Sequence, residues 1–347
     1  MNFHILTIPQ IPTTREYSSF PFNGIILNFC DMLMNNNQNV YYYGHEENDI
    51  RGTETINIIP KDFYYNNFSK ENLKYSSHAR DNNNPVIDKF DSEVHLRVNE
   101  RLTTDDIVLA FYGFEHYEIC KKINCINVEP SIGYEHTFSA NKIYASNSHL
   151  SISVGSPSNS KSPTDVVIPH MFRKEDFVYE SEKDNYILFL GRICIDKGCH
   201  IIDKLCSDLG FKLKVAGPEC GYKFKCNYEY VGNVGIEERC NLLSKAKALI
   251  APTQYFEPFG QIVIEALLSG TPVITTDWGA FPETNIHGVT GFRCNTYEDF
   301  VNAIESIDII KPSQCRLEGE KYLIENLQDR YLNYMEYILK YYANKYK

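Results

Sequence analysis

Short apolar runs alternate with amphipathic stretches along this chain, a pattern that is typical of parallel sheets covered by helices. Residues 1–9 contain a first apolar run, residues 24–34 have helical periodicity, and residues 40–44 form a second apolar run. The opening therefore predicts a strand, a helix and a second strand, a βαβ unit.

The rest of the first half is less regular. Residues 46–103 are polar and predict loops with an inserted helix or two. Beyond them, short apolar runs predict further strands at 106–111, 125–129, 142–146 and 150–154.

The second half is a clear α/β series. Residues 165–170 lead into the charged stretch 173–184, which is the predicted linker. Strands are then expected at 186–190, 212–216, 230–234, 248–250 and 271–276, and helices at 198–209 and 236–247. This alternation predicts a parallel sheet whose ligands bind outside the carboxyl ends of the strands. Residues 318–347 form a final helical tract.

Two glutamates bracket the apolar helix expected before residue 270. Pro258 suits the first helical position, which places Glu257 just ahead of the helix and Glu265 about two turns down, on the side of Gln261. The backbone N–H groups of residues 259–261 would then offer an anion site between the two carboxylates. This arrangement suits a phosphorylated sugar. The spacing equally allows Glu257 to be a simple helix cap and Glu265 to be solvated.

A second candidate group follows the predicted strand 186–190. Gly191 allows a ligand to approach the backbone, Arg192 has the planar fork that suits phosphate oxygens, and Lys197 adds a movable charge five residues on. Each charge-assisted contact contributes about 1.5–3 kcal/mol, so the two cations together could hold a diphosphate and stabilise it as a leaving group. Taken alone, Arg192 could instead be an ordinary surface salt-bridge partner.

Length and composition set limits on function. A chain of 347 residues usually divides into two domains, and a net charge of −11 argues against a protein that grips nucleic acid mainly by neutralising phosphates. Eleven cysteines without a CxxC pair are typical of reduced thiols, not of disulfides or a zinc site. With no basic apolar leader and no run of eighteen apolar residues, we expect a soluble, cytoplasmic protein.

Both candidate groups lie at predicted carboxyl ends of strands in one domain, so a doubly wound sheet would bring them to the same edge. Their motifs, together with those around them, resemble the retaining glycosyltransferases of the large family-four group. The motifs are Gly-Arg and Lys-Gly at 191–198, Val-Gly-Asn-Val at 231–234, Glu-Pro-Phe-Gly at 257–260 with a second glutamate at 265, Gly-Thr-Pro-Val at 270–273, Gly-Ala-Phe-Pro-Glu at 279–283 and Gly-Val-Thr-Gly-Phe at 288–292. The resemblance is specific over about 166–293 and general over the first 120 residues.

The resemblance implies the GT-B architecture, two facing Rossmann-like domains with doubly wound parallel sheets. It predicts an acceptor-binding domain at 1–168, a nucleotide-sugar-binding domain at 169–315, and a C-terminal helical tract at 316–347 that packs across both.

The resemblance also assigns roles to residues. Arg192 and Lys197 match the pair that holds the nucleotide diphosphate, Glu257 matches the glutamate that binds hydroxyls of the donor sugar, and Glu265 matches the one that accepts hydrogen bonds from ribose. Backbone atoms of Val234 would meet the base. Backbone N–H groups of Phe259, Gly260 and Gln261 would lie near sugar and phosphate. No cofactor and no metal are expected, because the cations and the helix end replace the metal.

The first domain departs from the family pattern at two positions, Gly24 and Glu129. Gly24 is the single glycine kept from a Gly-Gly loop that contacts phosphate or acceptor. Glu129 takes roughly the place of a histidine near the reacting sugar, where it could orient a substrate or cap a turn, and His136 follows as a site or structural residue.

The implied function is metal-independent transfer of a sugar, with retention of configuration, from a UDP- or GDP-linked donor to a glycan or other hydroxyl acceptor. The family's expected front-face mechanism lets the leaving phosphate help to take the acceptor proton. The alternatives are a nucleotide-sugar epimerase of similar build, a dehydrogenase, or a catalytically silent sugar-nucleotide-binding protein. A dehydrogenase should carry a G-x-G-x-x-G turn after its first strand, which this chain lacks.

Overall fold

The computed structural model describes residues 1–17, 20–68, 84–134, 136–155 and 161–345. The chain divides into two compact units. Unit 1 comprises Met1–Ala145, Leu150–Met171 and Leu327–Lys347, and unit 2 comprises Ser146–His149 and Phe172–Asn326. The two units are described separately below.

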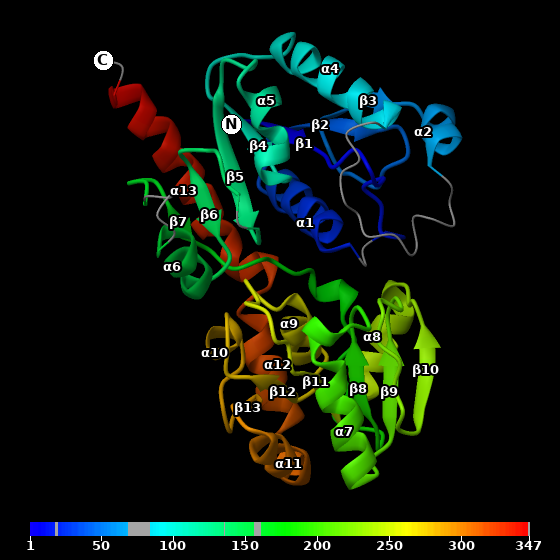
Figure 1. The fold of residues 1–347 in the computed structure, drawn as a ribbon. Helices are drawn as coiled ribbons and strands as arrows, with labels where there is room; N and C mark the ends of the chain where they lie inside the picture. The colour runs from blue at the N-terminus through cyan, green and yellow to red at the C-terminus, as the bar shows by residue number, and fades with distance from the viewer. Residues whose placement is uncertain (18–19, 69–83, 135, 156–160, 346–347) are drawn as a thin grey trace. The chain divides into compact units, whose positions relative to one another are not determined.

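Within the described residues, unit 1 contains a seven-stranded sheet of order β3-β2-β1-β4-β5-β6-β7 (Figure 1). Every neighbouring pair is parallel, and Phe3 on β1 lies opposite Val40 on β2 and Ile107 on β4. The strands are β1 (Asn2–Leu6), β2 (Asn39–His45), β3 (Glu54–Ile59), β4 (Asp106–Ala110), β5 (Ile126–Ile132), β6 (Lys142–Tyr144) and β7 (Val166–Val167). The strand order reverses between β1 and β4, as in doubly wound folds.

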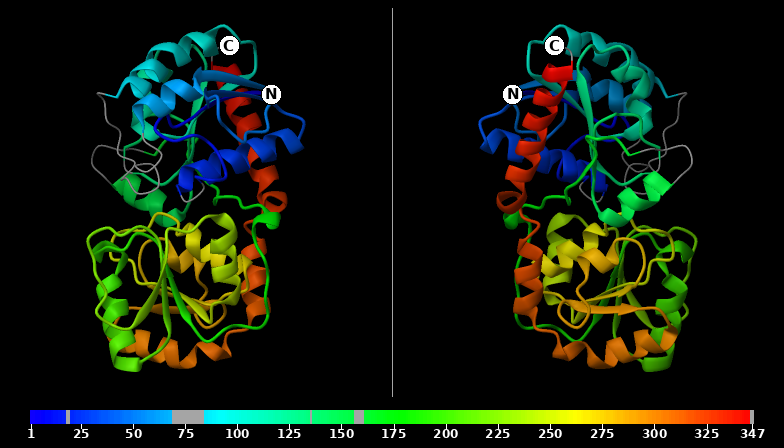
Figure 2. Two further views of the ribbon diagram at one scale, coloured as in Figure 1. Left: turned by 90° about the vertical axis from the view of Figure 1, so that its right-hand side faces the viewer. Right: turned by 90° about the vertical axis from the view of Figure 1, so that its left-hand side faces the viewer.

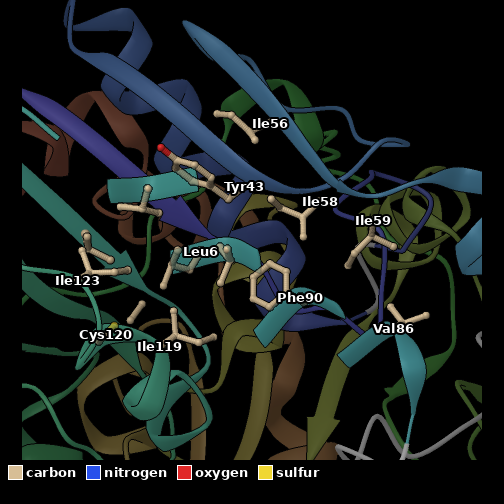
Figure 3. Packing of buried hydrophobic residues seen from close by; sticks show 14 of the residues in the cluster. Leu6, Tyr43, Ile56, Ile58, Ile59, Val86, Phe90, Ile119, Cys120 and Ile123 are labelled. Carbon is tan, nitrogen blue, oxygen red and sulfur yellow. The ribbon is translucent and has the colours of Figure 1, made fainter. Parts of the chain in front are cut away.

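The helical elements of unit 1 among the described residues, besides the C-terminal helix, are α1 (Pro21–Asn35), α2 (Lys61–Asn67), α4 (Pro85–Asn99), the 3₁₀ turn η1 (Gly113–His116), α5 (Tyr117–Cys120) and α6 (Asn147–Gly155), which begins in unit 2. Of these, α1, α4 and α5 bury several apolar side chains. Figure 3 shows one core cluster, in which Leu6 and Tyr43 from the strands meet Phe90 of α4 and Ile119 of α5. Burial of such side chains, at about 25 cal/mol per Å², drives the assembly of the layer.

The long C-terminal helix α13 (Ile324–Lys345) lies beside α1 (Figure 2). The Tyr331 ring packs edge-on against Phe29 of α1, with ring centroids 4.8 Å apart. Its hydroxyl lies within hydrogen-bonding distance of the carbonyls of Ile168 and Pro169, at 3.2 and 2.7 Å. These contacts make α13 part of the unit 1 core from Leu327 onward.

Unit 2 contains a six-stranded parallel sheet of order β10-β9-β8-β11-β12-β13 among its described residues. Its strands are β8 (Ile187–Leu190), β9 (Leu213–Ala216), β10 (Tyr228–Gly232), β11 (Ala248–Ala251), β12 (Val273–Thr276) and β13 (Gly291–Cys294). The order again reverses at the centre, between β8 and β11, and a reversal of this kind leaves a crevice at the carboxyl ends of the two strands.

The helices of unit 2 pack as two groups, α8 with α9 and α12, and α7 with α11. Right-handed crossovers that run in opposite directions along a sheet place their helices on opposite faces. The α-helices are α7 (Cys199–Leu209), α8 (Ile236–Lys245), α9 (Gln261–Leu268), α10 (Phe281–Thr284), α11 (Tyr297–Ser306) and α12 (Pro312–Glu320), and the 3₁₀ turns are η2 (Lys174–Asp176), η3 (Ile195–Lys197) and η4 (Ile307–Ile309).

The structure differs from the sequence prediction in two regions, residues 150–154 and residues 46–103. The predicted strand at 150–154 is wrong, because these residues belong to helix α6. The polar stretch 46–103 contains the strand β3, which the prediction lacked, beside the helices α2 and α4. No helix within the described residues is long and apolar enough to cross a membrane.

Candidate active site

The loops after β8, β9, β10, β11 and β12 all emerge at one edge of the unit 2 sheet, because the strands are parallel. Arg192 follows β8, Val234 follows β10, and Glu257 lies in the loop after β11. The β8 and β11 loops flank the point where the strand order reverses, which is where ligands of such sheets bind.

Lys197 and Glu257 meet directly in this place. The Lys197 Nζ lies 2.9 Å from Glu257 Oε2, and 19% and 13% of the two side chains are exposed. The Tyr255 hydroxyl donates to the same oxygen at 2.8 Å, and the ammonium lies 4.7 Å from the centre of the Tyr255 ring. Burial lowers the pKa of Lys197, while the charge of Glu257 and then Tyr255 raise it. Together they outweigh the effect of burial, so the pKa of Lys197 lies above its ordinary value. The ammonium group therefore stays charged.

Close backbone packing brings Lys197 to Glu257. Gly198 has φ +74°, and a Cβ there would lie 2.1 Å from the carbonyl oxygen of Pro252. Beside it, the Gln254 amide donates to the carbonyl of Asp196 at 2.8 Å. The turn that carries Lys197 thus lies directly on the loop that carries Glu257, at a distance that only glycine permits.

The loop after β12 holds Glu257 from another direction. The Ala280 amide donates to the Glu257 carbonyl at 2.9 Å. Gly279 has φ +64°, and a Cβ there would lie 2.6 and 2.7 Å from the carbonyl oxygen and the nitrogen of Glu257. The main chain of Glu257 is therefore fixed by a neighbouring loop and not only by its own helix.

The helix after Glu257 begins later than predicted. Helix α9 starts at Gln261 with Gly260 as its N-cap at φ +79°, so the expectation that Pro258 takes the first helical position is wrong. The reason lies in Phe259, whose ring is buried between Phe172 and Tyr322, with ring centroids 6.4 and 5.9 Å away. This anchor requires a turn at Gly260 before the helix can start.

Glu265 lies one turn into α9 and is almost fully buried, so the alternative that it is solvated does not hold. Arg239 of α8 approaches it, with Nε 3.6 Å from Glu265 Oε2. Burial raises the pKa of Glu265, Arg239 opposes this, and Asp176 raises the pKa further. The Arg239 Nε is itself buried, and no described residue forms a hydrogen bond with it. Sequence analysis missed Arg239. Its position four residues before Leu243, on the buried face of α8, is the signal that could have indicated it.

The other predicted residues of unit 2 lie at the same edge. Gly191 directly follows β8. The side chain of Arg192 is exposed and has no ion-pair partner among the described residues. Val234 is buried, two residues beyond the end of β10.

The three candidates of the first domain lie in unit 1. Gly24 lies in the first turn of α1, where a Cβ would meet no atom of the described residues within 4 Å. Glu129 is fully buried and accepts hydrogen bonds from the amides of Phe138 and Ser139, at 2.8 and 2.7 Å, and from the hydroxyl of Tyr134. Burial raises the pKa of Glu129 to about 7, while the amides oppose the rise.

The imidazole of His136 is exposed, and its carbonyl accepts from the Phe114 amide at 3.3 Å. All eleven cysteines are free thiols. No cluster of three or more His, Cys, Asp or Glu side chains that could hold a metal ion occurs within the described ranges.

Comparison with known proteins gives a family match that includes the unit 2 site residues. The family described as Glycosyl transferases group 1 matches residues 171–318. The O-antigen chain mannosyltransferase RfbU of Salmonella typhimurium is 26% identical over 184 residues, which are 49% of this chain and 52% of RfbU. A glycogen synthase of Mycobacterium tuberculosis is 30% identical over 123 residues, 31% of this chain and 30% of that protein. The chain thus spans about half or less of the length of these relatives.

Solved structures match nearly the whole chain. The crystal structure of Anabaena HepE in complex with UDP and glucose has a TM-score of 0.69 at 13% identity, with 97% of this chain and 99% of HepE covered. The crystal structure of AviGT4, a glycosyltransferase involved in avilamycin A biosynthesis, has a TM-score of 0.68 at 16% identity, with 98% of each chain covered. The two all-parallel sheets with their helices therefore have the fold of GT-B glycosyltransferases, as predicted.

Proposed function

We propose that this chain, which belongs to the Glycosyl transferases group 1 family, transfers a sugar from a nucleotide-diphosphate sugar to a hydroxyl acceptor, with retention of configuration and without a metal ion. The contact of Lys197 with Glu257 at the carboxyl edge of the unit 2 sheet is the observation that carries this proposal. HepE, which shares the fold, was solved with UDP and glucose, and a UDP-sugar is therefore the first donor to test.

The proposed roles follow from charge and position. Lys197, which is held protonated, and the exposed guanidinium of Arg192 bind the diphosphate and offset the charge that builds up as it leaves. The second oxygen of Glu257, Oε1, accepts hydrogen bonds from hydroxyls of the donor sugar, since Lys197 and Tyr255 occupy Oε2.

The remaining roles concern the nucleotide and the start of α9. Glu265 accepts from the ribose, and backbone atoms of Val234 meet the base. Gly191 lets the diphosphate approach the backbone at the end of β8. The backbone of residues 259–261 enters α9 with the positive end of the helix dipole toward the sugar and phosphate.

In the transfer step, the bond between the anomeric carbon and the phosphate oxygen breaks, and the acceptor oxygen bonds to the same face of that carbon. The leaving phosphate takes the acceptor proton, so the products are the glycoside and the nucleoside diphosphate. Gly24 and His136 of unit 1 are proposed as contributors on the acceptor side, whereas the buried carboxylate of Glu129 caps the turn at residues 138–139. The acceptor is a glycan or another hydroxyl compound.

A panel of UDP-glucose, UDP-N-acetylglucosamine and GDP-mannose, assayed for release of free nucleotide, tests the proposal. Lys197→Ala and Glu257→Ala should each slow release by about 10²-fold or more, the scale of losing one transition-state contact. The exposed pair Lys204 and Asp208 on α7, 2.7 Å apart, gives matched controls, and Lys204→Ala and Asp208→Ala should retain full activity. Nucleotide binding without release from any donor would favour a silent binding protein and overturn the proposal.

A further inference from the structure

The one tryptophan of the chain lies in an unusual position. Trp278 follows β12 at the edge of the unit 2 sheet that carries Glu257, and 53% of its surface is exposed. A tryptophan side chain contributes most to stability or binding when its large apolar surface is buried, and its N–H group can donate a hydrogen bond to solvent or a ligand. An exposed tryptophan at the edge where ligands bind therefore calls for a reason beyond packing.

The structure holds this exposed ring in a fixed place. The Phe256 ring meets the Trp278 ring edge-on, with centroids 5.9 Å apart at 84°, and Phe256 directly precedes Glu257. Asp277 precedes Trp278 in the chain. Its amide donates a hydrogen bond to the Cys294 carbonyl, and its Oδ1 lies 3.5 Å from Arg293 Nε. After it, Gly279 and Ala280 pack on Glu257, as described above. The backbone on both sides of Trp278 is thus pinned while the ring stays open to solvent.

The chemistry of this place matches one face of a sugar. A pyranose ring has an apolar C–H face that packs on a flat aromatic surface, and its hydroxyls at the rim need hydrogen-bond partners. Trp278 offers the flat surface, and the carboxylate of Asp277 with the guanidinium of Arg293 offers the partners beside it. An isolated surface aromatic needs no explanation, but one pinned beside a carboxylate that is proposed to bind sugar has a specific use.

The order of the strands indicates which sugar fits. In the sequence β8-β11-β12, the diphosphate cations follow β8, Glu257 follows β11 and Trp278 follows β12. A donor that reaches from the cations to Glu257 would have its diphosphate on one side of this carboxylate, and Trp278 lies on the other. In transfer with retention the reacting hydroxyl lies next to the leaving phosphate, so a sugar ring at Trp278 would be a neighbouring ring of an acceptor glycan that extends past Glu257.

We propose that Trp278 is the stacking platform for a sugar ring of a glycan acceptor, held beside the Glu257 site. This inference rests on the proposed glycosyltransferase function. Because Trp278 is the only tryptophan, fluorescence excited at a wavelength that tyrosine does not absorb reports on this position alone in the unaltered protein.

The test titrates the wild-type protein, saturated with UDP, with methyl α-D-glucopyranoside, methyl α-D-mannopyranoside and maltotriose, and with sorbitol as an acyclic control. We expect a saturable change in tryptophan emission with at least one glycoside and none with sorbitol. In a transfer assay with the same glycosides, Trp278→Ala should raise the acceptor KM about tenfold or more, the scale of losing a stacked ring, and Trp278→Phe should retain part of the affinity. Nucleotide release without acceptor should stay within about twofold of the wild type, and Tyr337→Ala, at an exposed tyrosine of α13, should change neither value.

Two results would overturn this inference. In the first, the protein releases nucleotide from a donor while every glycoside leaves the emission unchanged. In the second, Trp278→Ala raises the donor KM instead, which would assign the ring to the donor sugar. Absence of nucleotide release from all donors would count against the proposed function itself, and the two failures are therefore distinguishable.

Discussion

Replacement of Arg239 by methionine should destabilise unit 2, because it leaves the Glu265 carboxylate buried without its cation. Breaking a buried ion pair by removing one partner costs about 3–5 kcal/mol. The two side chains retain 15% and 11% exposure, which argues for the lower end, about 3 kcal/mol. For a domain of this size each kcal/mol lowers the melting temperature by about 2–4 °C, so we expect a fall of about 6–12 °C.

The same pair predicts the pH dependence of this loss. Burial holds the pKa of Glu265 above its ordinary value of 4.5, and Asp176 adds to the rise. A carboxyl group with a raised pKa binds its proton more tightly in the folded state, so its contribution to stability falls as pH rises from 4.5 through the folded pKa. Removal of Arg239 raises that pKa further. The loss of melting temperature should therefore be largest near pH 8 and smallest near pH 4.5.

Thermal unfolding followed by circular dichroism at both pH values measures these effects. The double variant Arg239→Met/Glu265→Met should recover most of the lost stability, since apolar residues can replace a buried pair. Lys204→Met, which removes an exposed ion pair, should cost less than about 1 kcal/mol. An Arg239→Met protein that melts within about 1 °C of the wild type at pH 8 would refute the reasoning.

Two further predictions concern a turn and a buried acid. Gly198→Ala should lower both the melting temperature and the rate of nucleotide release, because its Cβ would meet the Pro252 carbonyl at 2.1 Å and displace Lys197. The control Gly210→Ala, at φ +67° with open space around it, should cost only about 1–2 kcal/mol of backbone strain and leave nucleotide release unchanged. Equal effects of the two substitutions in melting and release assays would contradict this account. Because the pKa of Glu129 is about 7 in the folded protein, its contribution to the free energy of unfolding falls as pH rises from 4.5 to 7. Glu129→Gln should therefore make the free energy of unfolding, measured in urea, less dependent on pH over this range. An unchanged slope between these pH values would argue against a neutral buried acid at Glu129.

The unit 2 fold follows closely from its sequence. Short apolar runs predicted the places of β8, β9, β11 and β12, because strands buried on both faces of a parallel sheet contain few polar residues. The grouping of Lys197 with Glu257 was also predictable, since both follow strands whose carboxyl ends meet at one edge.

The errors arose where distant contacts decide local structure. Residues 150–154 alternate like a strand, yet the carboxylate of Glu283, more than a hundred residues away, accepts from the amides of Asn147 and Ser148 and fixes the first turn of α6. The start of α9 depends on the pocket for the Phe259 ring, and the partner of Glu265 depends on how α8 meets α9. The half-exposed strand β3 at the sheet edge has too weak a pattern to be recognised.

The way Glu257 is held bears on how its surroundings can diverge. The loop that carries Glu257 is fixed by main-chain hydrogen bonds. The Gln254 amide donates to the Asp196 carbonyl, and the Ala280 amide donates to the Glu257 carbonyl. Glycines stand at the points of closest approach. Such contacts are indifferent to side-chain identity. Side chains on these loops, such as that of Trp278, can therefore be exchanged without moving the carboxylate itself.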